Sequence, residues 1–170
     1  MPLNVVRALI VLVVAVLTIP SVAATRSPNG VRVEIYGDHS DVGGGAPYDQ
    51  LIGVFVAPHI LFATTTAFEW HPYDLGNFGA RMTGVLEVVA DGEYSFTLDS
   101  ADGSLLFIDG ALVVDHGGGT GPEPATGRVF LTAGRHPFEV QAFEDYGGPS
   151  GVDLILPPGV SYGPLAERRR

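Results

Sequence analysis

Two Asp-Gly pairs, Asp102-Gly103 and Asp109-Gly110, lie close together on either side of an apolar run at residues 105–108 (LLFI). Asp followed by Gly favours a tight turn, because the Asp side chain caps backbone amides and Gly adopts positive φ. A carboxylate at an exposed turn is also a ligand for a cation or a polar molecule. The segment therefore predicts two turns around a buried strand, with a candidate ligand site at the first turn, at the rim of a β-fold.

Apart from this carboxylate turn, the sequence lacks the motifs of several common classes of enzyme and metal site. Cysteine is absent, which excludes disulfides and thiolate zinc sites. The five histidines include no pair at the i, i+4 spacing of zinc hydrolases, and no Gly-x-Ser-x-Gly sequence marks a nucleophilic serine. If Gly103 were the sixth residue of an EF-hand loop, Leu98 would stand at its first position, which needs a carboxylate. We therefore expect no enzymatic activity.

Aromatic side chains are the other candidates for ligand contact, because their apolar faces can pack on a sugar ring. Tyr146 is best placed, in a glycine-rich stretch beside acidic residues, and Trp70 and Tyr73 are alternatives. Four aromatic residues fall instead on the apolar phase of predicted strands, so we expect them in the core. They are Tyr94, Phe96, Phe107 and Phe138.

Short β-strands are the elements that must position these residues. Residues 93–99 alternate polar and apolar side chains, which is typical of a half-buried strand. Residues 105–108 and 111–114, joined by Asp109-Gly110, predict a hairpin whose two central residues both have positive φ. Further strands are predicted at residues 31–36, 51–56, 84–89, 128–131, 138–143 and 152–156. Because no segment after Ala24 sustains helical periodicity, the sequence predicts an all-β fold, an antiparallel β-sandwich or barrel.

The N-terminal residues have the pattern of a signal peptide. Arg7 precedes an apolar run at residues 8–19 and the small residues Ser21-Val22-Ala23-Ala24. That run is shorter than the roughly 20 apolar residues that span a bilayer, although an uncleaved anchor is the alternative. We expect export to the outside of the cell or to the cell envelope, with no membrane span after cleavage. The expected order is a signal peptide (1–24), a linker (25–30), one β-domain (31–162) and a charged tail (163–170).

The chain is acidic, with 9 Lys and Arg against 19 Asp and Glu and a formal net charge of −10. Such a surface repels phosphate backbones, so we expect no nucleic-acid partner. It suits cations or neutral ligands such as sugars, and solubility alone is the alternative explanation.

Three segments occur in the order seen in one known family. They are residues 84–116 (GVLEVVADGEYSFTLDSADGSLLFIDGALVVDH), 127–144 (GRVFLTAGRHPFEVQAFE) and 151–159 (GVDLILPPG). Together they resemble the fourteen-kilodalton domain named after a bacterial toxin's protective antigen, over residues 31–160 and most strongly over 84–143. The resemblance implies a lectin-like β-barrel that serves as a carbohydrate-associated module.

The resemblance also implies a binding site. In sugar-binding members, two adjacent aspartates joined by a cis peptide bind a calcium ion, and the ion holds vicinal sugar hydroxyls. The matching positions here read Ala101-Asp102, so one carboxylate is missing, which weakens a site for an ion that takes six to eight oxygen ligands. The alternative is that Asp102-Gly103 only makes a turn. The resemblance implies Asp102, Glu144 and Asp145 as metal ligands, and Asp99, three residues before Asp102, is a further candidate ligand. The candidate ligand-binding residues are Asp102 and the aromatic residues Tyr146 and Trp70.

We therefore expect a secreted, non-catalytic carbohydrate-binding module, assisted by calcium, whose partner is a glycan or cell-surface polysaccharide. The alternative is a structural or protein-interaction β-domain at the cell surface, with a degenerate calcium site and a cell-surface protein as its partner. Calcium should raise the melting temperature under the first hypothesis and leave it unchanged under the second, because a ligand that binds only the native state stabilises it.

Overall fold

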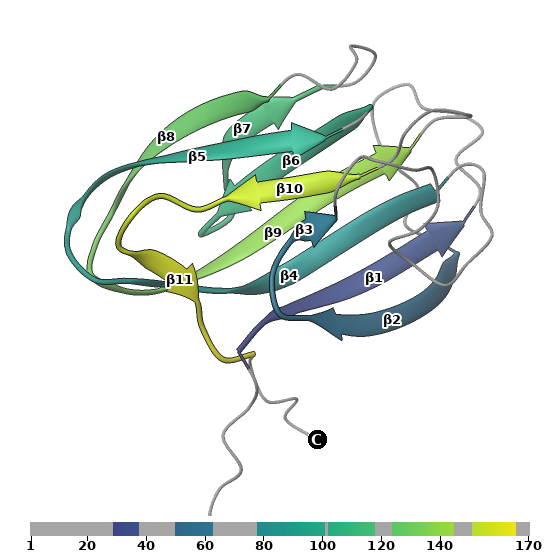
Figure 1. The fold of residues 1–170 in the computed structure, drawn as a ribbon, viewed down its shortest axis with the longest axis horizontal. Helices are drawn as coiled ribbons and strands as arrows, with labels where there is room; N and C mark the ends of the chain where they lie inside the picture. The colour runs from purple at the N-terminus through teal and green to yellow at the C-terminus, as the bar shows by residue number, and fades with distance from the viewer. Residues whose placement is uncertain are drawn as a thin grey trace, which may run out of the picture.

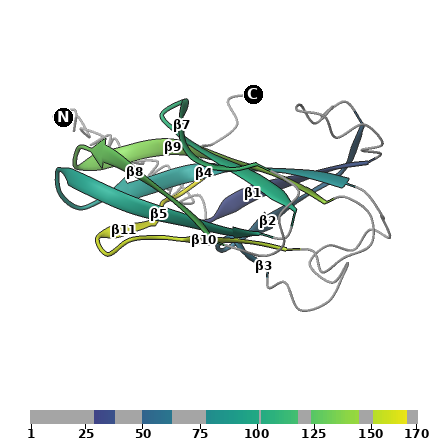
Figure 2. The ribbon, with the colours of Figure 1, turned by 90° about the horizontal axis from the view of Figure 1, so that it is seen from above.

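The structure is a computed structural model that describes residues 29–37, 50–62, 78–100, 102–117, 124–144 and 151–165. Within these ranges the chain forms eleven β-strands and no helix. The strands make two antiparallel sheets that pack face to face (Figure 1, Figure 2). No helix long and apolar enough to cross a membrane occurs in the ranges described. The predicted all-β antiparallel sandwich is confirmed.

The large sheet has seven strands in the order β2-β1-β4-β9-β6-β7, and β11 pairs with β4 beside β1. The small sheet has the order β3-β10-β5-β8. The strands of the large sheet are β1 (Val31–Gly37), β2 (Leu51–Ala57), β4 (Phe78–Val88), β6 (Gly103–Ile108), β7 (Ala111–His116), β9 (Gly134–Glu144) and β11 (Val160–Tyr162). Those of the small sheet are β3 (Leu61–Phe62), β5 (Gly92–Ser100), β8 (Ala125–Leu131) and β10 (Val152–Ile155).

The core lies between the sheets and is built by strand alternation. The two longest strands, β4 and β9, pair along their whole length at the centre of the large sheet. In β5, Phe96 and Leu98 are fully buried and Tyr94 packs against the core, which confirms the predicted inward face. The largest buried side chains are Phe78, Phe96, Ile35, Ile60, Met82, Leu86, Leu98, Leu106 and Ile108. Removal of this apolar surface from water is the main term that stabilises the sandwich.

The β6–β7 hairpin forms as predicted. Asp109 and Gly110 both have positive φ, 53° and 79°, as a two-residue turn of this type requires. The prediction of Phe107 as a core residue is wrong. Within the uniformly apolar run, Leu106 and Ile108 point into the core, so Phe107 faces the opposite side of the sheet, half-buried.

Several strands begin earlier than the sequence pattern indicated. The strand β4 begins at Phe78 rather than at residue 84, because Phe78, Ala80 and Met82 alternate inward while Gly79 obscures the pattern. The strands β8 and β9 likewise begin at Ala125 and Gly134. Glycine within a strand weakens the sequence signal, but pairing with long neighbours compensates for it in the folded sheet.

The two sheets come close together where β7 faces β8. A Cβ atom added to Gly127 in β8 would lie 1.8 Å from the carbonyl oxygen of Val113 in β7. Only glycine permits this approach of two backbones, which explains why a residue unfavourable in strands stands here.

Candidate functional site

Strand ends from both sheets meet at one end of the sandwich. In the large sheet Gly37 pairs with Phe78, Phe78 with Glu144, and Phe143 with Gly103. In the small sheet Ser100, the last residue of β5, pairs with Val152, the first residue of β10. Two residues link β5 to β6, so the two sets of strand ends adjoin. We call this the loop end, defined by Gly37, Phe78, Ser100, Gly103, Glu144 and Val152.

Asp102 lies at the loop end, in the short connection that takes the chain from the small sheet to the large one. Its φ of 59° is in the left-handed region, which Asp and Asn tolerate better than most residues. Residue 101 lies outside the described ranges. Asp102 therefore has the turn-making backbone that the structural alternative predicts, and the same turn holds its half-buried carboxylate at the loop end.

A buried polar cluster anchors this connection from beneath. The hydroxyl oxygens of Ser100 and Ser104 lie 2.8 Å apart, and Nδ1 of His116 lies 3.4 Å from the Ser100 oxygen. Both serines are fully buried and His116 is nearly so. A Ser-His pair sealed from solvent is structural rather than catalytic, because no substrate reaches it. Its effect is to tie β5, β6 and β7 together directly below Asp102.

Asp99 is directed away from this cluster. Strand alternation buries Leu98 and Ser100 and places Asp99 on the outer face of the small sheet, paired across the strands with Asp153. Burial raises the pKa of Asp153, and the nearby Asp99 charge raises it further. Its Oδ1 is buried and has no hydrogen-bond partner within the described residues. Asp153 was not among the predicted site residues, although the alternation in Val152-Asp153-Leu154 places its side chain outward.

The sequence matches one known protein family over nearly all of the strands described above. Residues 29–161 match the PA14 domain family, a span that includes all eleven strands except the last residue of β11. The chain belongs to the PA14 domain family. No curated protein of similar sequence was found.

Solved structures share the fold of this PA14 domain. An anti-sigma factor domain-containing protein has a TM-score of 0.66 and 22% identity over 86% of this chain. The chain spans 49% of that protein's length. The PA14 sugar-binding domain from an RTX adhesin has a TM-score of 0.59 and 20% identity, covering 75% of this chain and 90% of the adhesin domain. The Epithelial Adhesin 9 A domain from Candida glabrata, in complex with Galb1-3GlcNAc, has a TM-score of 0.57 and 13% identity, covering 81% and 88%.

The structure describes some of the predicted site residues of this PA14 domain, and the others lie outside the described ranges. The structure brings Asp102 and the backbone of Glu144 to the same loop end, and places Asp99 beside Asp153 on an outer face. Trp70, Asp145, Tyr146 and the side chain of Glu144 lie outside the described residues. Within the ranges described, no group of three or more His, Cys, Asp or Glu side chains could hold a metal ion.

Proposed function

We propose that this PA14 domain is a secreted or cell-envelope, non-catalytic carbohydrate-binding module whose partner is a glycan or cell-surface polysaccharide. The family match supports the proposal, as do two proteins of the same fold, one titled a sugar-binding domain and one solved with a disaccharide. The observation that carries it is Asp102, held in a left-handed turn at the point where the strand ends of both sheets meet.

Asp102 would act as a positioned acceptor for sugar hydroxyls. Hydrogen bonds to an ionised carboxylate are shorter and stronger than those between neutral groups. The Ser100–Ser104 contact fixes both strands that flank the turn, so little conformational freedom is lost on binding.

Calcium assistance stays a prediction from the family resemblance. Calcium takes six to eight oxygen ligands, and the described residues contain no group of three or more His, Cys, Asp or Glu side chains that could hold a metal ion. Those residues do not by themselves fit the ion, so no step of the proposed binding passes through it. Thermal melting with millimolar calcium and with chelator tests the prediction, because an ion that binds only the native state raises the melting temperature.

A glycan array probed with the full chain tests the proposed function. Wild-type protein should bind a defined set of glycans, and Asp102→Asn should weaken binding while keeping the turn, since Asn also tolerates the left-handed region. A matched control is Asp91→Asn, which removes an acidic charge far from the loop end, at the turn between β4 and β5. Binding by Asp102→Asn equal to that of wild type would refute the role of the loop end.

A second candidate function, protein interaction at the cell surface, is favoured by β2. This strand forms one end of the large sheet in the part of the chain described, and it carries no charged residue. Its exposed apolar side chains are Leu51, Ile52, Val54 and Val56. Uncharged, exposed edge strands promote pairing with other chains. An empty glycan array, together with self-association that Val56→Lys abolishes in light scattering, would favour this function.

A further inference from the structure

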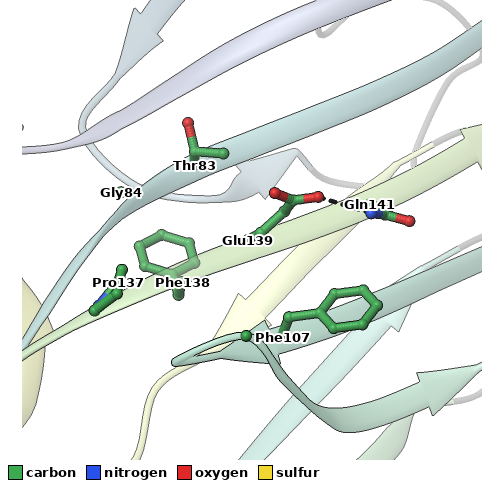
Figure 3. A pocket seen from close by; sticks show the side chains of 8 residues that line it. Thr83, Gly84, Phe107, Pro137, Phe138, Glu139 and Gln141 are labelled. Carbon is green, nitrogen blue, oxygen red and sulfur yellow. Dashed lines mark hydrogen bonds between the residues drawn. The ribbon is translucent and has the colours of Figure 1, made fainter. Parts of the chain in front are cut away.

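A groove of about 440 Å³ opens on the outer face of the large sheet, opposite the core. It is lined from three neighbouring strands by Thr83 of β4, by Pro137, Glu139 and Gln141 of β9, and by Phe107 of β6 (Figure 3). Its volume lies in the range of sites that bind small molecules. The groove runs across the middle of the sheet and includes none of the residues that define the loop end.

Strand register places an aromatic ring beside polar groups in this groove. Glu139 pairs with Thr83 on one side and with Phe107 on the other. In the adjacent row, Gln141 pairs with Arg81 and Leu105. Directly paired side chains on one face of a sheet lie roughly 5 Å apart. An apolar ring and several hydrogen-bonding groups therefore share a surface a few residues wide.

The polar groups are fixed before any ligand arrives. Arg81 Nη2 donates a hydrogen bond of 2.6 Å to Glu139 Oε2, and Gln141 Nε2 donates one of 2.7 Å to Glu139 Oε1. The hydrogen bond from Arg81 lowers the pKa of Glu139, so this carboxylate is ionised at neutral pH. A carboxylate accepts about four hydrogen bonds and a primary amide donates two and accepts two. The Glu139–Gln141 pair can therefore form further hydrogen bonds with adjacent hydroxyl groups of a ligand.

The charges beside the groove balance. Arg81 also lies 3.9 Å from Glu34, and Glu34 accepts a hydrogen bond of 2.7 Å from Arg32. Two guanidinium groups thus face two carboxylates. Because each carboxylate is paired with a guanidinium group, the surface favours neither a metal cation nor a phosphate or acidic polymer.

We propose that this groove is a second carbohydrate site, one that binds a neutral sugar without calcium. The ring of Phe107 packs on the C–H face of the sugar, while Glu139 and Gln141 bind neighbouring hydroxyl groups. The inference rests on the proposed carbohydrate-binding function, but it places the contact on a different face and on different residues.

Binding by the full chain to immobilised cellohexaose, maltohexaose and Galb1-3GlcNAc tests the proposal, with sialylated Galb1-3GlcNAc as the charged comparison. Phe107→Leu and Gln141→Ala should each weaken binding to the neutral probes about tenfold or more, the effect of losing one good contact. The matched control is Phe130→Leu, which changes an exposed phenylalanine on the outer face of the small sheet. In an Asp102→Asn background, which weakens the loop-end site, Phe107→Leu and Gln141→Ala should lower the binding that remains, and chelator should leave that remaining binding unchanged.

The pattern of losses separates the two sites. Binding lost in Asp102→Asn but retained in Phe107→Leu and Gln141→Ala would overturn the groove and support the loop end. Preference for the sialylated probe, absence of binding to all neutral probes, or equal weakening by Phe130→Leu would also overturn the groove. If Phe107→Leu fails to fold, Gln141→Ala and Glu139→Gln carry the test, since both replace half-buried polar side chains on the sheet face.

Discussion

His136 Nδ1 lies 2.6 Å from Asp109 Oδ2, which ties the start of β9 to the turn of the β6–β7 hairpin. The other ring nitrogen, Nε2, lies 2.9 Å from the carbonyl oxygen of Thr132. Both neighbours are acceptors, and only the protonated imidazolium donates from both nitrogens. The hydrogen bond to Asp109 raises the pKa of His136, against the opposing effect of burial.

A raised histidine pKa stabilises the fold on the acid side. The contribution should be complete below the unfolded pKa, near 6.5, and should be lost as pH rises through the higher folded value. Because Asp109 is half exposed, we expect an effect of only about 1 kcal/mol. Asp109→Asn keeps a residue that tolerates positive φ and removes the charge, so it should flatten this pH dependence. NMR titration of the His136 ring checks the pKa, and an unchanged value in Asp109→Asn would contradict the assignment.

The ionised carboxylate of Asp153 should destabilise the folded state. Burial and the adjacent Asp99 raise its pKa, so ionisation of Asp153 opposes folding above the unfolded pKa, near 3.8. Asp153→Asn should raise the melting temperature at pH 7 by about 2–4 °C, as roughly 1 kcal/mol does in a domain of this size. The gain should vanish at pH 3, where both states are protonated. Asp99→Asn, which relieves only the like-charge repulsion, should give a smaller gain, and an equal or larger one would contradict this account.

The backbone and the carboxylate of Asp102 can be tested separately. At the φ of 59°, the alanine of Asp102→Ala keeps the steric penalty of a Cβ atom but lacks a polar side chain that can hydrogen-bond locally. The substitution should lower the free energy of unfolding by about 1 kcal/mol. Asp102→Gly should cost less, because glycine adopts positive φ freely. Urea denaturation measures both. Equal losses in the two variants would show that the side chain, rather than the backbone conformation, stabilises the turn.

The close approach at Gly127 should tolerate no side chain. Gly127→Ala would bring a methyl group against the Val113 carbonyl, forcing β7 and β8 apart. We expect a loss of about 3 kcal/mol or a failure to fold, at the upper end for overpacked sites. Gly92→Ala is the matched control, because its added Cβ would meet only the Tyr94 ring at 3.7 Å. Urea denaturation of both variants is the measurement, and similar stabilities would contradict the predicted clash.

Local sequence patterns predicted the parts of the fold that local physics controls. Alternation in residues 93–99 identified the inward face of β5, and Asp109-Gly110 identified the hairpin because few other dipeptides adopt positive φ twice. The prediction that Phe107 lies in the core was wrong. A continuous apolar run does not reveal which phase faces the core, and the phase was decided by the pairing of β6 with β9.

The sequence by itself determined an all-β domain with Asp102 in a tight turn, because alternation and turn chemistry act between neighbouring residues. The tertiary structure decided which distant residues meet. It paired Asp99 with Asp153, brought Arg81 to Glu139, and turned Phe107 outward into the groove beside Glu139. Each of these contacts depends on strand order and register across a whole sheet, and no short segment of the chain encodes either one.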